Sequence, residues 1–165
     1  MDAQELRTLQ APIKEQYRED ADTAIFTLSA SGKLGEGVTC KVETGGKLVE
    51  AGLHPMAGGS GMAVCSGDML LEALVACAGV TLNAVATAIE VDLRDATISA
   101  EGDIDARGTL GVDKEAPVGF KNIRLTFDMD TDATQEQKDT LIKLTERYCV
   151  VFQSISHTPE MEVIY

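Results

Sequence analysis

Hydrophobic and polar positions change their spacing several times along the chain, and each change marks a predicted element. Residues 1–22 are polar and charged, and Pro12 is expected to break any long helix there, so they are predicted to form an N-terminal arm. Short apolar runs separated by glycine-containing turns then predict a small antiparallel meander, with strands at 23–30, 37–43 and 47–51. The glycine-rich segment 52–67 predicts a loop.

The next stretch, 69–89, is mostly apolar and about as long as a membrane span, roughly 20 residues. Glu72 and Asn83 interrupt it, and its flanks are acidic instead of basic, which argues against a span. We therefore predict a helix buried inside protein. Ser66 is a suitable N-cap, and Asp68 lies in the first turn, where a carboxylate favours the helix dipole.

The second half of the chain predicts a strand pair and a helix. Apolar and polar residues alternate at 96–105 and again at 123–129, with a long connection between the two strands. Thr134 and Gln137 form a capping box that begins an amphipathic helix, predicted to end near Cys149. The last five residues, 161–165, predict a short final strand.

The order of these elements gives the fold class α+β. The length of 165 residues favours one domain after the arm, at 23–165. A helix that is apolar on nearly every face needs covering on all sides, which a chain of this size can hardly provide alone. We therefore expect a dimer.

Charge and composition exclude several classes of partner. Lys and Arg number 14 against 27 Asp and Glu, a net charge of −13, so nucleic-acid phosphates and anionic lipid surfaces would repel the chain. Aromatic residues make up only 4%, too few for a stacking platform for bases. The first residues carry no secretory signal, and we expect a cytoplasmic protein that binds neither nucleic acid nor membrane.

Candidate metal and phosphate sites are weak, and we expect neither metal nor cofactor. Asp128, Asp130 and Asp132 imitate the start of a calcium loop, but alanine stands where that loop needs glycine. His54 and His157 have no partner at ligand spacing.

The four cysteines carry the remaining chemistry. No C-x-x-C pair occurs, so neither a disulfide framework nor a zinc ribbon is indicated. Cys77 lies in the middle of the buried helix, and Cys149 lies at the end of the second helix. Each is either a small core residue or a reactive thiol. Cys40 is assigned to packing, and Cys65 has no assigned role.

The contexts of two cysteines resemble a known family. The glycine-rich loop leading into SGDMLLEALVACAGVTL, the later strand pair and ERYCVV are similar to the osmotically inducible protein C (OsmC) and organic hydroperoxide resistance (Ohr) family, over about 23–165. The motifs are A-C-x-x-x-T, with Cys77 and Thr81, and E-R-Y-C, which ends at Cys149. The resemblance implies an OsmC-like intertwined homodimer, with long central helices enclosed between antiparallel β-sheets and active sites at the subunit interface.

The resemblance also implies a stress-response thiol peroxidase. Cys77 matches the peroxidatic position and Cys149 the resolving position, and an external dithiol, of lipoyl type for some members, would reduce the resulting disulfide. A free thiol with a pKa of about 8.5 is only slightly ionised at pH 7, so Cys77 needs a stabilising group, for which arginine is suited.

The family supplies that arginine from near its first strands and holds it with a carboxylate at the start of the central helix. Here Lys33 occupies the first strand turn, so Arg18 and Asp68 are the candidates. A second departure is Val150, because relatives often have proline after the resolving cysteine.

We therefore predict a peroxidase that reduces hydroperoxides through a Cys77 sulfenic acid resolved by Cys149. Organic hydroperoxides would be favoured by an apolar wall of Leu70, Leu74, Val80, Val151 and Phe152. The alternative is a noncatalytic OsmC-like module that binds an apolar small molecule at the dimer interface. A different thiol-dependent activity on the same scaffold is a third.

Overall fold

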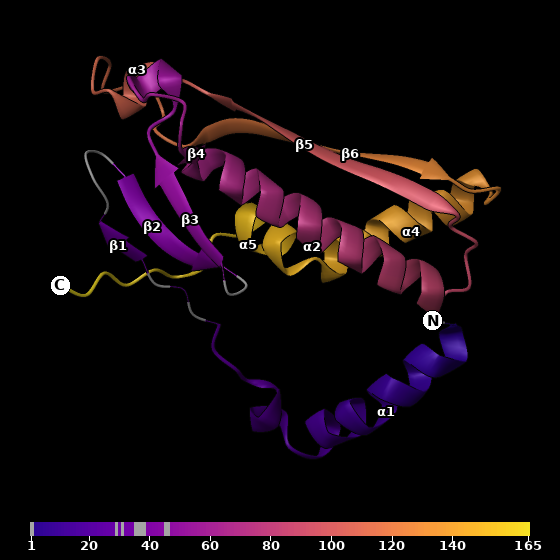
Figure 1. Cartoon of the computed structure of the whole chain (residues 1–165). Helices are drawn as coiled ribbons and strands as arrows, with labels where there is room; N and C mark the ends of the chain where they lie inside the picture. Colours follow the sequence, from indigo (N-terminus) through magenta and orange to yellow (C-terminus); the bar gives the residue numbers. More distant parts are fainter. Residues whose placement is uncertain (1, 29, 31, 35–38, 45–46) are drawn as a thin grey trace. The chain divides into compact units, whose positions relative to one another are not determined.

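The computed structural model describes residues 2–28, 30, 32–34, 39–44 and 47–165, and for 32–34, 39–40 and 42–44 it describes the backbone alone. The chain forms two compact units. The first unit comprises Met1–Phe26, Ala73–Ser99 and Thr126–Tyr165, and the second comprises Thr27–Glu72 and Ala100–Leu125. Helix α2 and strands β5 and β6, which are labelled in Figure 1, each contribute residues to both units.

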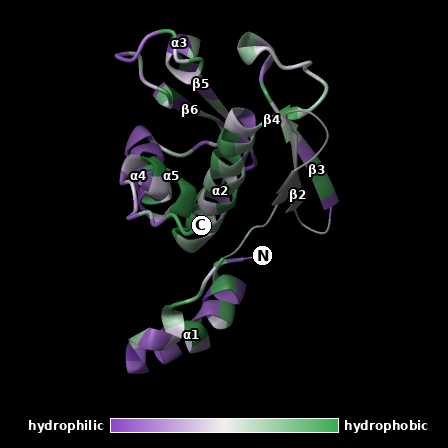
Figure 2. Cartoon of the chain, turned by 90° about the vertical axis from the view of Figure 1, so that its left-hand side faces the viewer, coloured by the Kyte–Doolittle hydropathy of each residue, from purple (hydrophilic) through white to green (hydrophobic). Residues whose placement is uncertain are grey.

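The first unit is largely helical. Its helices are α1 (Ala3–Glu19), the 3-10 helix η1 (Ala21–Ala24), most of α2 (Ser66–Ala88), α4 (Gln135–Tyr148) and α5 (Val150–Ser156). It also contains the first half of strand β5 (Asp95–Ile104) and the second half of strand β6 (Phe120–Asp130). Figure 2 shows α2 as predominantly hydrophobic, whereas α4 is mostly hydrophilic. The predicted capping box is present at the start of α4, where Thr134 and Gln137 bond each other's backbone N–H.

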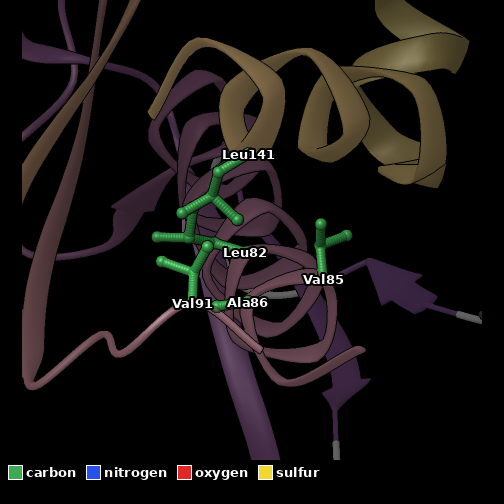
Figure 3. Close-up of a cluster of buried hydrophobic side chains, with 5 residues drawn as sticks. All are labelled: Leu82, Val85, Ala86, Val91 and Leu141. Atoms are coloured by element: carbon green, nitrogen blue, oxygen red, sulfur yellow. The ribbon is translucent and has the colours of Figure 1, made fainter. Parts of the chain in front are cut away.

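The hydrophobic core of the first unit forms where α2 meets α4. Leu82, Val85 and Ala86 of α2 are buried together with Val91 and with Leu141 of α4 (Figure 3). Leu82 and Leu141 are almost fully buried, at 1% and 0% exposure. Partly buried residues of β5 and β6, among them Ile98 and Phe127, pack against this cluster. These contacts hold the middle of α2 and the body of α4 together.

The second unit contains a four-stranded sheet in the order β1-β2-β3-β4, with strands Gly32–Leu34, Thr39–Thr44, Lys47–Gly52 and Val64–Cys65. The pairings β1–β2 and β2–β3 are antiparallel, whereas β3–β4 is parallel. Strands β2 and β3 correspond to the strands predicted at 37–43 and 47–51, of which residues 37–38 lie outside the described part of the chain, whereas β1 falls on the turn predicted after 23–30. The predicted loop at 52–67 contains the 3-10 helix η2 (Pro55–Ala57) and β4. Gly59 is required there, because a Cβ would lie 1.6 Å from the carbonyl oxygen of Leu53.

Strands β5 (Asp95–Ile104) and β6 (Phe120–Asp130) form a separate two-stranded sheet, with the short helix α3 (Ala106–Thr109) in their connection. The N–H of Arg94 donates to the carbonyl oxygen of Asp130 at 3.0 Å, so the start of β5 lies beside the end of β6 and the strands are antiparallel. Side chains alternate between partly buried and exposed along both strands, which confirms the period of two read from the sequence.

The expected break at Pro12 was wrong. Helix α1 runs through this residue from Ala3 to Glu19. Proline removes one backbone donor, but the rest of the helix outweighs that loss: the segment is rich in helix-forming residues, and Asp2 and Glu5 form a complete capping box at its start.

Two predicted strands are absent from the described residues. Residues 21–24 form η1, because the side chain of Asp20 accepts from the N–H of Asp22 and turns the chain, and 25–28 have no regular structure. Residues 161–165 are also irregular. In both places the pattern of apolar residues is typical of a strand, but none of the described strands pairs with these segments. Apolar side chains such as Phe26 and Ile164 are exposed there.

The long apolar helix was predicted correctly, and it begins at Ser66 itself, the residue expected to cap it. Among the described helices it is the one with the length and composition of a membrane span. Five of its side chains are buried in this chain, so it serves as a core helix along one face, whereas Val80 is 74% exposed. The prediction of complete burial is therefore not met within a single chain.

Truncating the central contact between α2 and α4 tests this description. Leu141→Ala is expected to lower the free energy of unfolding by about 2–5 kcal/mol, because it leaves a cavity in a fully buried site. The matched change Val112→Ala, at a side chain 73% exposed, should alter it by less than about 0.5 kcal/mol. Urea denaturation of the reduced protein measures both, and equal effects would contradict the assigned core.

Candidate active site

The candidate site lies in the first unit, where the middle of α2 meets the junction of α4 and α5. Cys77 comes from α2, and Cys149 is the single residue that separates α4 from α5. The structure therefore brings together the two cysteines that the sequence singled out. Both are free thiols, and each shifts the pKa of the other.

Cys149 has a structural role at the junction. Its backbone N–H donates to the carbonyl oxygen of Thr145 and closes α4. Its Sγ accepts from the N–H of Phe152 at 3.5 Å and so caps the start of α5. The side chain is buried, with 1% exposure. Its position is thus fixed by both helices.

The surroundings of Cys77 favour its thiolate. Partial burial raises the pKa of Cys77, but hydrogen bonding outweighs this effect, so the pKa is lowered overall. The groups that lower it are the N–H of Val151, the Cys149 side chain, the N–H of Val150 and the Thr81 side chain. The groups with the largest lowering effect are all neutral donors. The sulfur is stabilised by the first backbone N–H groups of α5, where the sequence analysis expected a cation.

The partner thiol is shifted in the opposite direction. Burial raises the pKa of Cys149, and its hydrogen bond and charge interaction with Cys77 raise it further, against the lowering effect of the Phe152 N–H. Cys77 is therefore the more readily ionised member of the pair, and Cys149 stays protonated and donates to it. This difference matches the chemistry of an attacking and a resolving thiol.

The two predicted charged residues lie elsewhere in the chain. Arg18 is an exposed residue of α1 and bonds Glu15 at 2.7 Å. Asp68 is exposed and precedes Cys77 by nine residues of α2, which corresponds to about 14 Å of helix rise. Neither is among the groups that chiefly set the pKa of Cys77. The side chain of Lys33 lies outside the described residues. The catalytic roles of Arg18 and Asp68 stay predictions.

Three groups of the site were not assigned a role from the sequence. Thr81 was part of the motif A-C-x-x-x-T, and its spacing of four residues from Cys77 on a helix is the signal that it could reach the sulfur. The N–H groups of Val150 and Val151 carry no signal of their own, because α5 itself was not predicted. Relatives often have proline at the position of Val150, and proline has no backbone N–H. Valine at this position therefore supplies a donor that proline could not supply.

The remaining candidates have other surroundings. Of the proposed apolar wall, Leu74 is buried, Val151 and Phe152 are half-buried, and Leu70 and Val80 are exposed. Asp130 and Asp132 bind the guanidinium of Arg94, which lowers the pKa of both carboxyls. Within the described part of the chain, no group of three or more metal-ligating side chains occurs.

Comparison with known proteins identifies the family of this chain. The family model of OsmC-like proteins matches residues 58–164, and the chain therefore belongs to the OsmC-like protein family. The match includes both Cys77 and Cys149. It confirms the resemblance inferred from the two cysteine motifs. A search of curated proteins found no match.

Solved structures show the same fold. An OsmC-like protein from Mycoplasma pneumoniae is 15% identical, with a TM-score of 0.67 over 81% of this chain and 89% of that one. An organic hydroperoxide resistance protein OsmC from Legionella pneumophila, described as a predicted redox protein, is 19% identical, with a TM-score of 0.63 over 81% and 91%. An organic hydroperoxide resistance protein from Elizabethkingia anophelis is 18% identical, with a TM-score of 0.61 over the same shares.

The backbone donors of α5 can be tested by replacing one of them. Val150→Pro removes the N–H that reaches Cys77 and suits the position, because proline is accepted at the first residue of a helix and Cys149 before it is already extended (φ −75°, ψ 107°). The pKa of Cys77 should rise. The pH dependence of iodoacetamide alkylation at Cys77, mapped by mass spectrometry, should therefore move to higher pH.

Val150→Ala is the matched control, because it shortens the side chain and keeps the N–H. Its alkylation profile should follow that of the unchanged protein. If Val150→Pro and Val150→Ala gave the same profile, with the same helix content by circular dichroism, the N–H of residue 150 would have no part in stabilising the thiolate.

Proposed function

We propose that this chain is a cysteine-based thiol peroxidase that reduces hydroperoxides. The observation that carries the proposal is the placement of Cys77 on α2 beside Cys149 at the α4–α5 junction, with the pKa of Cys77 lowered and that of Cys149 raised. Membership of the OsmC-like family supports it, as do the names of two similar structures, which describe organic hydroperoxide resistance proteins. We infer organic hydroperoxides as the substrates.

The reaction begins with attack by the Cys77 thiolate on the terminal oxygen of the hydroperoxide. The O–O bond breaks, the S–O bond forms, and a proton converts the leaving alkoxide into an alcohol. Cys77 is thereby oxidised by two electrons to a sulfenic acid, and the hydroperoxide is reduced. The N–H groups of Val150 and Val151 hold the thiolate before attack, because they already bond its sulfur.

Cys149 then resolves the sulfenic acid. Its thiol loses a proton and attacks the Cys77 sulfur, an S–S bond forms, and the sulfenic oxygen leaves as water. The two thiols are neighbours in the reduced state, since each shifts the pKa of the other. An external dithiol, for which we propose a lipoyl-type compound, returns the disulfide to two thiols by exchange and is itself oxidised to a disulfide.

Peptide mapping tests the peroxidase proposal. Reduced protein treated with one equivalent of cumene hydroperoxide and digested without reductant should yield a peptide pair joined by a Cys77–Cys149 disulfide, with one equivalent of alcohol released. Cys149→Ser should stop the reaction at the sulfenic acid, which dimedone traps on Cys77. Cys77→Ser should abolish both products, because no other thiolate is held by these donors.

Cys65→Ser provides the matched control. Cys65 is a free, partly buried thiol of the second unit, and its removal should leave the rate of disulfide formation unchanged. If Cys77 stayed unmodified while the hydroperoxide was still present, the peroxidase proposal would fail. A noncatalytic module that binds an apolar small molecule would then be the better description.

We also propose a homodimer, supported by the exposed side of α2. Val80 is 74% exposed, and the small apolar residues Ala73, Ala76 and Ala84, at helical spacing from it, are exposed as well. A continuous apolar stripe on a helix of this length marks an interaction surface, and a second copy of the chain offers the same stripe around a two-fold axis. The family resemblance favours the same partner.

Light scattering after size-exclusion chromatography tests the dimer. The unchanged protein should have twice the chain mass of 17.6 kDa, and Val80→Glu should shift it toward one chain mass, because a buried unpaired carboxylate is costly. Val112→Glu, at an equally exposed valine of the second unit, should keep the dimer. A single chain mass for the unchanged protein at high concentration would contradict the proposal.

A further inference from the structure

A hollow of about 470 Å³ lies on the surface of the first unit, on the side of the last turn of α4 and of α5. It is lined by the side chains Arg147, Tyr148, Val150, Gln153, Ser154 and His157. No step of the proposed peroxidase reaction uses the hollow. It adjoins the cysteine site through one residue, because Val150 lines it and also donates its backbone N–H to Cys77.

The charge of the hollow is unlike that of the chain as a whole. Acidic residues outnumber Lys and Arg by 27 to 14, yet the lining has no carboxylate and includes one arginine and one histidine. Each of the other arginines forms an ion pair with a carboxylate: Arg7, Arg18, Arg94, Arg107 and Arg124. Among the described residues, Arg147 alone has a guanidinium with no carboxylate within salt-bridge distance.

Other polar side chains line the hollow together with Arg147. Its guanidinium carbon lies 5.5 Å from the centre of the Tyr148 ring, a cation–π contact that leaves its N–H groups available. Gln153 is held in place by donating to the backbone oxygen of Glu146 at 2.8 Å. Tyr148, Ser154 and His157, which line the hollow as well, have hydroxyl and imidazole groups that can donate hydrogen bonds.

We propose that this hollow binds the carboxylate of a small organic acid. A planar guanidinium that no protein carboxylate occupies can bind a ligand carboxylate through two parallel hydrogen bonds. The Tyr148 ring and the Val150 side chain offer apolar surface to the body of the same ligand. The volume suits a molecule of this class, since small-ligand sites measure about 300–1,000 Å³. The proposal does not depend on peroxidase activity.

Binding of benzoate tests this site. Benzamide is the control ligand, because it has the same ring and an uncharged amide in place of the carboxylate. NMR titration that records both ligand and protein signals, on the full chain carrying Cys77→Ser, keeps the result separate from any thiol chemistry. Benzoate should bind saturably and at least tenfold more tightly than benzamide, and the His157 ring signals should shift in the same titration. Arg147→Gln should weaken benzoate binding at least tenfold. The benzoate affinity of Arg147→Lys should lie between that of Arg147→Gln and that of the parent protein, because lysine keeps the charge and loses the planar guanidinium.

Arg7→Gln is the matched control, since this exposed arginine of the same unit pairs with Glu90 outside the hollow, and it should leave benzoate binding unchanged. Circular dichroism establishes that every variant is folded. Equal binding of benzoate and benzamide, or equal benzoate binding by Arg147→Gln and the parent protein, would overturn the proposal. Inorganic phosphate that binds as tightly as benzoate would overturn the assignment to an organic acid.

Discussion

The hydrogen bonds that the sulfur of Cys77 receives are the interaction on which the site depends. A thiol placed in the middle of an apolar helix is disfavoured as an anion, because burial opposes charge and the chain is strongly acidic. Backbone N–H groups are fixed dipoles that need no charged side chain. The start of α5 therefore supplies part of the stabilisation that such a sulfur requires.

These donors are in place because of packing some distance from the sulfur. Leu82 and Val85 of α2 are buried with Leu141 of α4, which sets α4 against the central helix (Figure 3). Thr145, one turn further along α4, is buried and bonds back to Leu141. Cys149 then follows as the cap of both helices. The core thus determines where α5 begins, and the start of α5 determines the chemistry of Cys77.

Much of this could be predicted from the sequence, and the exceptions have physical causes. Periodicity identified the long helix, the alternating strand pair and the capping box at Thr134, because each is encoded by neighbouring residues. The two cysteines could be recognised from their motifs. The donors to Cys77 could not, since a backbone N–H has no sequence signature and α5 is only seven residues long. The strands expected at 23–30 and 161–165 depend on partners that local sequence does not specify.

The dual position of Cys149 has a mechanical consequence. Its sulfur is the acceptor for the Phe152 amide, so any change in the bonding of that sulfur is transmitted to the first turn of α5. Once joined covalently to Cys77, this sulfur would tether the joint between two helices to a third. The exchange of the Phe152 amide proton with solvent would then report the oxidation state of the protein, and the surface beside that turn would differ between its reduced and oxidised forms.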